Sequence, residues 1–362
     1  MKVLFCTNVF QKVSNGPAKF AHLLLFEAGN CGFELHILTE DVYSEISTVH
    51  KLNLKVPKKL QLLSQIIRMW KYHKAAMALH KQYQFDVIVY NNAFVGLISS
   101  MLFKPTVGMI NDDNNAVKSF RSIWLKYAIF HQLEYLTCRR MKRIIVNSFY
   151  LENILSGQYR KEKNKFSVLY KGIENELVEM NRQAIIKQKE PGSILFVKTD
   201  FKTGGLSTLI EALKLIDTPL KLYIVGPNKT FHPMLSGELK DTKIDFKIYD
   251  YLPQTEVYGL MKNCEIFCVP SYFEAFGVAN LEALAFGCKI VSTNVGGIPE
   301  AINGNRFAWL VDSGNAFQLK EALAGAFTTS IEDDLVNIDE HLNNFKSSLV
   351  ATRFKMILEE CL

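Results

Sequence analysis

The chain alternates short apolar segments with amphipathic helical segments, and it does so twice. In the first half, apolar segments at 3–9 and 34–39 flank a helical pattern at 18–28, which Pro17 opens. The same alternation starts again at 194–197 and continues through the second half. Strands separated by helices run parallel, because each crossover returns the chain to the same end of the sheet. The pattern therefore predicts two parallel α/β sheets in tandem.

The length of 362 residues exceeds what one core normally organises and suits two such domains. A hydrophobic content of 48% with 22% charged residues excludes disordered and fibrous proteins. We expect the fold class α/β, with two Rossmann-like doubly wound domains facing each other across a cleft. The first domain is predicted over 1–185 and the second over 190–343, with a linker at 183–192.

The seven cysteines predict a reducing compartment. Their number is odd, they are scattered from Cys6 to Cys361, and several lie in apolar runs. Cys264 and Cys268 have no second Cys or His pair nearby, so we expect no zinc site. No apolar run reaches transmembrane length, and the N-terminal one is too short for a signal peptide. The expected localisation is cytoplasmic, with the inner face of the membrane left open.

Basic charge is concentrated in the first third of a chain whose net charge is +6. No acidic residue occurs from Ile46 to Phe85, while 55–81 is rich in Lys, and 118–143 contains only Glu134 as an acid. Both stretches also carry aromatic residues, which suits contact with an anionic membrane surface. The alternative is a helix packed on the sheet with a solvated cationic face. Nucleic acid is not expected as a partner, because no nucleic-acid motif accompanies the charge.

The densest signal for a functional site lies at 270–283, where a predicted strand ends and a helix begins. That junction is where a parallel sheet presents ligand-binding groups, and first-turn amides there suit phosphate or sugar hydroxyls. Glu274 lies in the loop and Glu282 lies inside the helix. A carboxylate can accept hydrogen bonds from adjacent hydroxyls, so two at this spacing could hold two diols. Taken alone, either glutamate is more often a solvated surface residue.

This segment resembles the E-x7-E signature of the family 4 retaining glycosyltransferases, which have the GT-B fold. Gly296-Gly297-Ile298-Pro299-Glu300 is also typical of that family, and the similarity extends to Asn147-Ser148 and to 169–174. The resemblance implies that Glu282 binds the ribose hydroxyls of a nucleotide sugar and that Glu274 contacts the transferred sugar. It also implies an acceptor-binding first domain and a C-terminal helix, 344–362, that crosses back to it.

Further donor contacts are expected on the same basis. The backbone of Phe276, Gly277 and Val278 would meet the sugar or the phosphates, and the loop with Tyr251 and Leu252 would lie near the base. Gly226, directly after the predicted strand 220–225, is also expected to bind the donor.

The loop after 194–197 departs from the family. Relatives usually carry an Arg and a Lys there to neutralise the leaving diphosphate. Here only Lys198 and Lys202 are available, and we favour Lys202, which precedes Gly204-Gly205. A solvated loop lysine is the alternative.

The first half contributes three expected site residues. Gly16, followed by Pro17, occupies the place of a glycine-rich loop that faces the phosphates in the family, although such a pair is also an ordinary turn. Asn111 and Asp112 stand where many relatives carry a His-Asp pair that contacts the donor sugar, and here Asn111 replaces the His. Asn cannot act as a base, which fits a mechanism in which the donor phosphate takes the acceptor proton. Asp112-Asp113 also suits a metal, but we expect a solvated or turn-forming pair and no metal.

The sequence therefore predicts a metal-independent, retaining hexosyltransferase without cofactors. It would move a hexose from a UDP- or GDP-sugar to a glycan or lipid-linked saccharide in cell-surface polysaccharide synthesis. Two alternatives stay open, namely a sugar-nucleotide epimerase on the same fold and a catalytically weak glycan-binding partner. A dehydrogenase is not expected, because the first βα turn lacks Gly-x-Gly-x-x-Gly.

Overall fold

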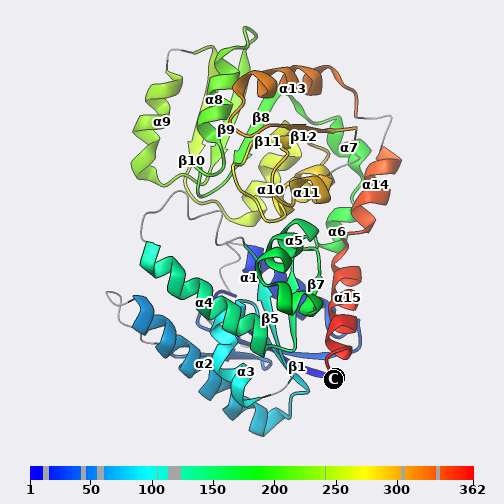
Figure 1. Ribbon diagram of the computed structural model, residues 1–362. Coiled ribbons are helices and arrows are strands. Elements are labelled where there is room, and N and C mark those ends of the chain that lie inside the picture. Colours follow the sequence, from blue (N-terminus) through cyan, green and yellow to red (C-terminus); the bar gives the residue numbers. More distant parts are fainter. Residues whose placement is uncertain are drawn as a thin grey trace. The chain divides into compact units, whose positions relative to one another are not determined.

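The computed structural model describes residues 1–10, 16–41, 46–54, 61–103, 105–112, 124–240, 242–302, 306–331 and 335–362. The chain divides into two compact units, Met1–Gly172 with Ser347–Leu362 (unit 1) and Ile173–Lys346 (unit 2) (Figure 1). The sequence placed the first boundary at 185, whereas residues 173–186 belong to unit 2. The C-terminal segment returns to unit 1 from Ser347 onward.

Unit 1 contains a parallel sheet whose described strands follow the order β3-β2-β1-β4-β5-β6-β7. Its strands are β1 (Lys2–Thr7), β2 (Glu34–Thr39), β3 (Val49–Lys51), β4 (Val87–Tyr90), β5 (Thr106–Ile110), β6 (Arg143–Val146) and β7 (Phe166–Val168). Its helices are α1 (Gly16–Glu27), α2 (Gln61–Tyr83), η1 (Ala93–Gly96), α3 (Leu97–Leu102), α4 (Trp124–Arg140), α5 (Phe149–Gln158), η3 (Arg160–Lys165) and α15 (Ser347–Glu359).

Unit 2 contains a second parallel sheet, whose described strands follow the order β10-β9-β8-β11-β12-β13. Its strands are β8 (Glu190–Val197), β9 (Leu220–Val225), β10 (Ile244–Tyr249), β11 (Cys264–Val269), β12 (Lys289–Thr293) and β13 (Ala308–Val311). Its helices are α6 (Asn175–Val178), α7 (Arg182–Ile186), α8 (Leu206–Lys214), η4 (Lys229–Phe231), α9 (His232–Leu239), α10 (Gln254–Asn263), α11 (Val278–Ala285), α12 (Ile298–Ile302), α13 (Ala316–Thr328) and α14 (Leu335–Asn343).

Both sheets have the doubly wound order, in which the chain adds strands outward from the centre in one direction and then in the other. The direction reverses between β1 and β4 in unit 1 and between β8 and β11 in unit 2. Ligands of open parallel sheets bind at this switch point, outside the carboxyl ends of the strands. The predicted class of two Rossmann-like units is thereby confirmed for each unit separately.

The C-terminal helix α15 completes the core of unit 1. Phe354 packs against Phe5 and Phe20, with ring centroids 6.2 Å apart in both pairs, and all three side chains are buried. Ser347 donates a hydrogen bond to the carboxylate of Glu27 in α1. An apolar helix stripe of this kind is stable only when it is packed, which explains why the chain ends on the first sheet.

The predicted linker at 183–192 was wrong. The segment contains most of α7 and the start of β8, whose Glu190 pairs with Cys264 of β11. Lys189, within this segment, donates from its ammonium to the carbonyl of Met261 at 2.7 Å. The Lys, Pro and Gly residues of this segment indicated a linker, but the segment contributes to α7 and β8 and its Lys189 side chain binds a backbone carbonyl.

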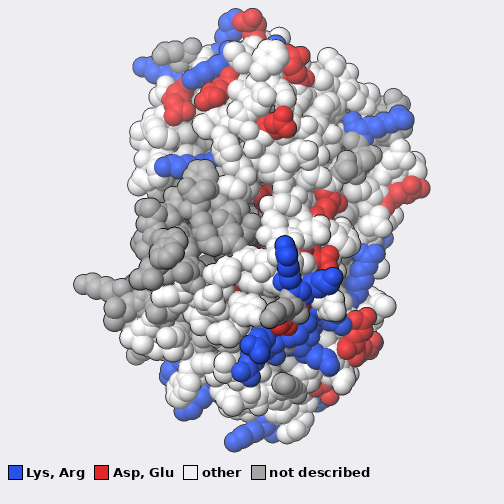
Figure 2. Space-filling model, viewed as in Figure 1, with Lys and Arg blue, Asp and Glu red and all other residues white. Residues whose placement is uncertain are grey.

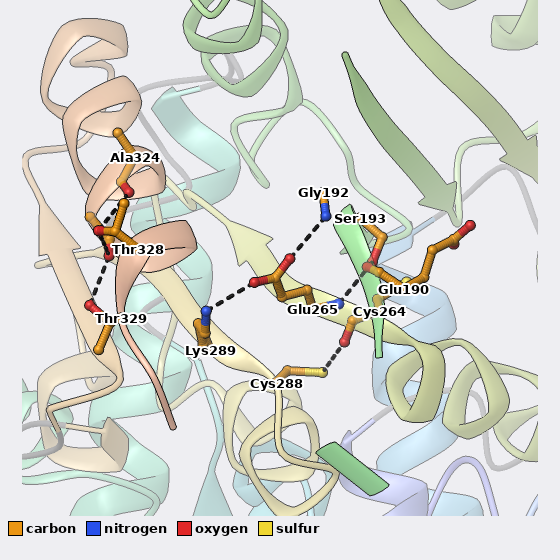
Figure 3. Close-up of polar contacts among 11 residues, drawn as sticks. Glu190, Gly192, Ser193, Cys264, Glu265, Cys288, Lys289, Ala324, Thr328 and Thr329 are labelled. Carbon is orange, nitrogen blue, oxygen red and sulfur yellow. Dashed lines mark hydrogen bonds and ion pairs between the residues drawn. The ribbon is translucent and has the colours of Figure 1, made fainter. Parts of the chain in front are cut away.

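The amino ends of the central strands of unit 2 are tied together by polar contacts (Figure 3). The carboxylate of Glu265 accepts from the amide of Gly192 and from the ammonium of Lys289, both at 2.9 Å. Ser193 accepts from the amide of Glu265 at 2.9 Å. These contacts join β8, β11 and β12 at the edge opposite to the one where parallel sheets bind ligands. We infer that these contacts stabilise the sheet of unit 2 and do not bind a ligand.

Candidate donor-sugar site and first-unit strand edge

The loop after β11 brings Glu274 to the switch point of unit 2. Lys198 follows β8 directly, and its ammonium contacts the carboxylate of Glu274 at 2.7 Å and the hydroxyl of Ser271 at 3.2 Å. The side chains of Lys198 and Glu274 are 21% and 28% exposed. An ion pair that remains accessible to solvent contributes little to folding, about 0–1 kcal/mol. The pair is therefore better suited to binding a ligand than to holding the sheet together.

Lys202, the cation favoured from the sequence, lies elsewhere. Its side chain is exposed, and its ammonium is 5.8 Å from the centre of the Phe231 ring. The structure thus brings Lys198 rather than Lys202 into contact with Glu274. The sequence could not distinguish them, because both follow the same strand.

The backbone of Glu274 is fixed by the glycine pair after β12. The amide of Gly297 donates to the Glu274 carbonyl at 3.1 Å. Gly296 has a φ of 58°, and a Cβ atom there would lie 1.7 Å from the same carbonyl oxygen. Only glycine allows this approach. The sequence singled out both glycines, and the structure shows that they position the loop carrying Glu274.

Gly226, expected to bind the donor, has a role within the protein itself. Its φ is 119°, and a Cβ atom would lie 2.6 Å from the carbonyl oxygen of Lys198. The missing side chain therefore lets the end of β9 approach the backbone that carries Lys198.

Glu282 is buried within α11, with 4% of its surface exposed. The hydroxyl of Tyr258 donates to one carboxylate oxygen at 3.1 Å, and the side-chain amide of Gln254 donates to the other at 3.4 Å. Both partners lie on α10. Burial, together with the charge of Glu282, raises the pKa of Tyr258, which therefore stays a neutral donor. Sequence reasoning missed both partners, since nothing in α10 marks them.

The remaining expected residues of unit 2 lie in the loop before α11, at the start of that helix, and in the loop before α10. Gly277 is the left-handed N-cap of α11 at φ 90°, and half-buried Val278 is the first residue of that helix. Phe276 is 1% exposed and its ring lies 5.8 Å from that of Phe345, so only its backbone is available to a ligand. Between β10 and α10, Tyr251 is 56% exposed and Leu252 is half-buried.

In unit 1, a row of asparagines follows three adjacent strands. Asn111, after β5, donates from its amide to the carbonyl of Asn91 at 2.7 Å and to its side-chain oxygen at 3.3 Å. Asn147, after β6, donates to the carbonyl of Asn111 at 2.9 Å. Asn91, after β4, donates to the hydroxyl of Thr7 at the end of β1 and to the carbonyl of Pro17. Asn91 was missed, although one Asn directly after each of these strands is a readable signal.

The other expected residues of unit 1 adjoin this edge in sequence. Asp112 follows Asn111, and Asp113 lies outside the described residues. Gly16 is exposed as the first residue of α1, and no atom of the described residues would lie within 4 Å of a Cβ there. Among the described residues, no group of three His, Cys, Asp or Glu side chains is placed to hold a metal. None of the described helices has the length and apolar character needed to cross a membrane.

Two doubly wound sheets with polar groups at both switch points define a GT-B-type α/β protein. The first half matches the model "Glycosyltransferase Family 4" over residues 14–177, and the second matches "Glycosyl transferases group 1" over 178–341. The chain therefore belongs to the group 1/family 4 glycosyltransferases. Its similarity to this family, stated above as a resemblance, is confirmed over nearly the whole sequence.

Similar proteins agree with this assignment. An uncharacterized glycosyltransferase of Methanocaldococcus jannaschii is 25% identical over 80% of this chain and 79% of its own length. The amylovoran biosynthesis glycosyltransferase AmsK of Erwinia amylovora is 30% identical over 44% of this chain and 41% of its own. Among solved structures, sucrose-phosphate synthase of Thermosynechococcus elongatus has a TM-score of 0.81 at 17% identity, covering 99% of this chain and 98% of that one. Anabaena Alr3699/HepE in complex with UDP-glucose has a TM-score of 0.73 at 18% identity, covering 99% and 100%. At such identities the structures show the shared fold.

Proposed function

We propose that this glycosyltransferase moves a hexose from a UDP- or GDP-sugar to a hydroxyl of a glycan or lipid-linked saccharide, with retention of configuration. The pairing of Lys198 with Glu274 at the switch point of unit 2 carries the proposal. It places a cation and a hydroxyl-binding carboxylate together, as a sugar joined to a diphosphate requires. The solved relative that holds UDP-glucose and the relative named for amylovoran biosynthesis support a nucleotide-sugar donor and a polysaccharide product.

Each group has a defined part in the proposed reaction. Glu282, held by Tyr258 and Gln254, accepts the ribose hydroxyls, while Glu274 accepts a hydroxyl of the transferred sugar. Lys198 and the first-turn amides of α11 stabilise the charge that develops on the leaving diphosphate. These groups neutralise the diphosphate without a metal ion. The donor phosphate takes the acceptor proton.

Incubation with UDP- and GDP-hexoses and a panel of saccharide acceptors tests the function. We expect a glycosylated product whose new linkage has the anomeric configuration of the donor, as read by NMR. Glu274→Gln should reduce the rate at least about tenfold, the loss expected for one hydrogen bond to a charged group. Glu238→Gln is the matched control, because Glu238 is exposed on α9. An inverted linkage would refute retention. Epimerised donor without transfer would favour an epimerase, and donor binding without turnover would favour a glycan-binding protein.

We also propose that unit 1 contacts an anionic membrane surface through α2. Met69, Tyr72 and Ala76 pack this helix on the sheet, while Leu63, Ile66 and Trp70 are each 46–48% exposed. Their spacing places the three exposed side chains on one face of the helix. The sequence left open whether this segment contacts a membrane or packs on the sheet. Helix α2 has a face for each, since one face is buried and another exposes apolar side chains.

Basic residues accompany this face. Lys71, Lys74 and Lys81 are exposed on α2, and the Lys74 ammonium lies 4.6 Å from the Trp70 ring. Cations beside exposed apolar side chains favour an anionic interface. Lys and Arg also gather around α5 and β7 (Figure 2), where η3 carries Arg160 and Lys163. The described part of the basic stretch 118–143 ends in further cations at 139–143.

Sedimentation with vesicles tests this contact. Binding to phosphatidylglycerol vesicles should exceed binding to phosphatidylcholine vesicles and should fall with salt. Trp70→Ser should weaken it, whereas Phe317→Ser, which removes an exposed aromatic residue of unit 2, should not. Equal binding of the Trp70 variant would argue against α2 as the contact.

A further inference from the structure

Lys171 is a buried lysine that the proposed donor chemistry does not use. It lies three residues beyond the end of β7 and is 5% exposed. The amide of Leu169 donates to the carbonyl of Val146 at 2.8 Å, which keeps this segment beside the end of β6. The carboxyl edge of the unit 1 sheet therefore extends to Lys171.

The ammonium of Lys171 has no hydrogen-bond acceptor within the part of the chain that the structure describes. It lies 3.8 Å from the centre of the Phe20 ring in α1, a cation–π contact that compensates only part of the lost hydration. Burial lowers its pKa to about 7, while the charge of Asp112 acts in the opposite direction. A buried ammonium is costly unless an anionic partner accompanies it.

Two acceptor oxygens along the same edge also lack partners among the described residues. They are the side-chain oxygens of Asn111 and Asn147, both buried. The amide nitrogens of these side chains donate along the asparagine row, which fixes the orientation of both groups. Amide oxygens need a donor, and a sugar hydroxyl is one. The edge therefore presents one cation and two hydrogen-bond acceptors that the described protein groups leave unsatisfied.

We propose that Lys171, Asn111 and Asn147 recognise the acceptor as a sugar residue that carries a carboxylate or a phosphate. Lys171 pairs with the anionic group, and the asparagine oxygens accept hydroxyl hydrogens. A neutral sugar would leave the ammonium with the attraction of Asp112 but without a hydrogen-bond acceptor among the described residues, and a simple anion would leave the amide oxygens unsatisfied. This inference rests on the proposed transferase function and defines the class of its acceptor.

Acceptor binding can be measured without turnover, which separates this inference from the proposed function. Calorimetric titration with glucuronate, glucose 6-phosphate and glucose should show tighter binding of an acidic ligand by about tenfold or more, the size of one charged hydrogen bond. The two acidic ligands distinguish a carboxylate from a phosphate. At pH 7, binding should take up protons, because an anion raises the pKa of Lys171. The uptake is read by repeating the titration in buffers of different ionisation enthalpy.

Lys171→Met should abolish both the preference for acidic ligands and the proton uptake, while the thermal shift produced by the nucleotide sugar stays unchanged. Lys163→Met, at an exposed position on η3, is the matched control and should behave as the wild type. Equal or better binding of glucose by the wild type would overturn the inference, and so would a preference that survives in Lys171→Met. If transfer fails with every acceptor but acidic ligands still bind through Lys171, the proposed function fails and the recognition site stands.

Discussion

Replacing Glu282 with Gln tests the donor site most directly. The side chain is buried, and both carboxylate oxygens accept hydrogen bonds from residues of α10. Glutamine has nearly the same shape as glutamate, and its amide oxygen can still accept the hydrogen bond from the Tyr258 hydroxyl. The substitution removes the negative charge and replaces one acceptor oxygen with a donor. A ribose that needs two acceptors therefore loses at least one charge-assisted hydrogen bond.

The expected loss can be stated as a shift in melting temperature. A hydrogen bond to a charged group contributes about 1.5–3 kcal/mol, so the nucleotide sugar should bind about 10- to 100-fold more weakly. A ligand at about 100 times its wild-type Kd stabilises the native state by about 2.7 kcal/mol. The same concentration stabilises the variant by only about 0.4–1.4 kcal/mol. At about 2–4 °C per kcal/mol for domains of this size, a shift of about 5–10 °C falls to about 1–5 °C.

Differential scanning fluorimetry with UDP- and GDP-hexoses measures this shift. Glu238→Gln, at an exposed position on α9, should keep the full wild-type shift. The ligand-free melting temperature of Glu282→Gln should stay within a few degrees of the wild type, since the amide oxygen still accepts from Tyr258. A variant that retains the whole ligand-induced shift would show that Glu282 does not contact the donor.

Four further outcomes are expected. Gly296→Ala should lower the free energy of unfolding by about 1–3 kcal/mol in denaturant titration, because a positive φ is unfavourable for alanine and its Cβ would clash with the Glu274 carbonyl. A variant as stable as the wild type would contradict this packing. Lys198→Met should reduce kcat/KM by about 10- to 100-fold and Lys202→Met by much less, and the reverse order would reassign the phosphate contact. The pKa of Lys171 is about 7 in the folded protein and near 10.5 in the unfolded chain, so burial of the ammonium destabilises the fold fully below pH 7 and progressively less as the pH rises to 10.5. Lys171→Met should therefore raise the melting temperature at pH 6 and have little effect above pH 10.5. A difference in melting temperature that does not depend on pH would exclude the buried ammonium as its cause. Activity should persist in excess EDTA, and a loss that added metal restores would refute metal-free transfer.

The element pattern was predictable because it depends on local periodicity. The expected strands at 34–39 and 220–225 have the bounds seen in the structure. These are short, nearly continuous apolar runs, as buried parallel strands require. The linker at 183–192 was mispredicted because its Lys, Pro and Gly residues suggested an exposed connection. The contact of Lys189 with Met261 is a tertiary interaction across 72 positions of sequence, which local composition does not reveal.

The site was predictable in its acidic residues and not in their partners. Glu274, Glu282 and Gly296 stand out through family motifs, and the structure adds that a backbone approach requires glycine at 296. The choice between Lys198 and Lys202, in contrast, depends on which side chain turns toward Ser271, and spacing along one loop does not encode this. Likewise, Gln254 and Tyr258 are ordinary helix residues until α10 packs beside α11.

The asparagine row shows what periodicity can reveal when it is read across strands. One Asn directly follows each of β4, β5 and β6, and the parallel order of these strands aligns the three side chains on one edge. A residue type that recurs at the carboxyl end of successive parallel strands therefore forms a spatial cluster that sequence alone can predict. Lys171 extends that edge, yet nothing in its sequence context marks the side chain as buried. Its burial therefore had to come from packing against Phe20, and that packing is what turns an ordinary lysine into a candidate for recognising an acidic acceptor.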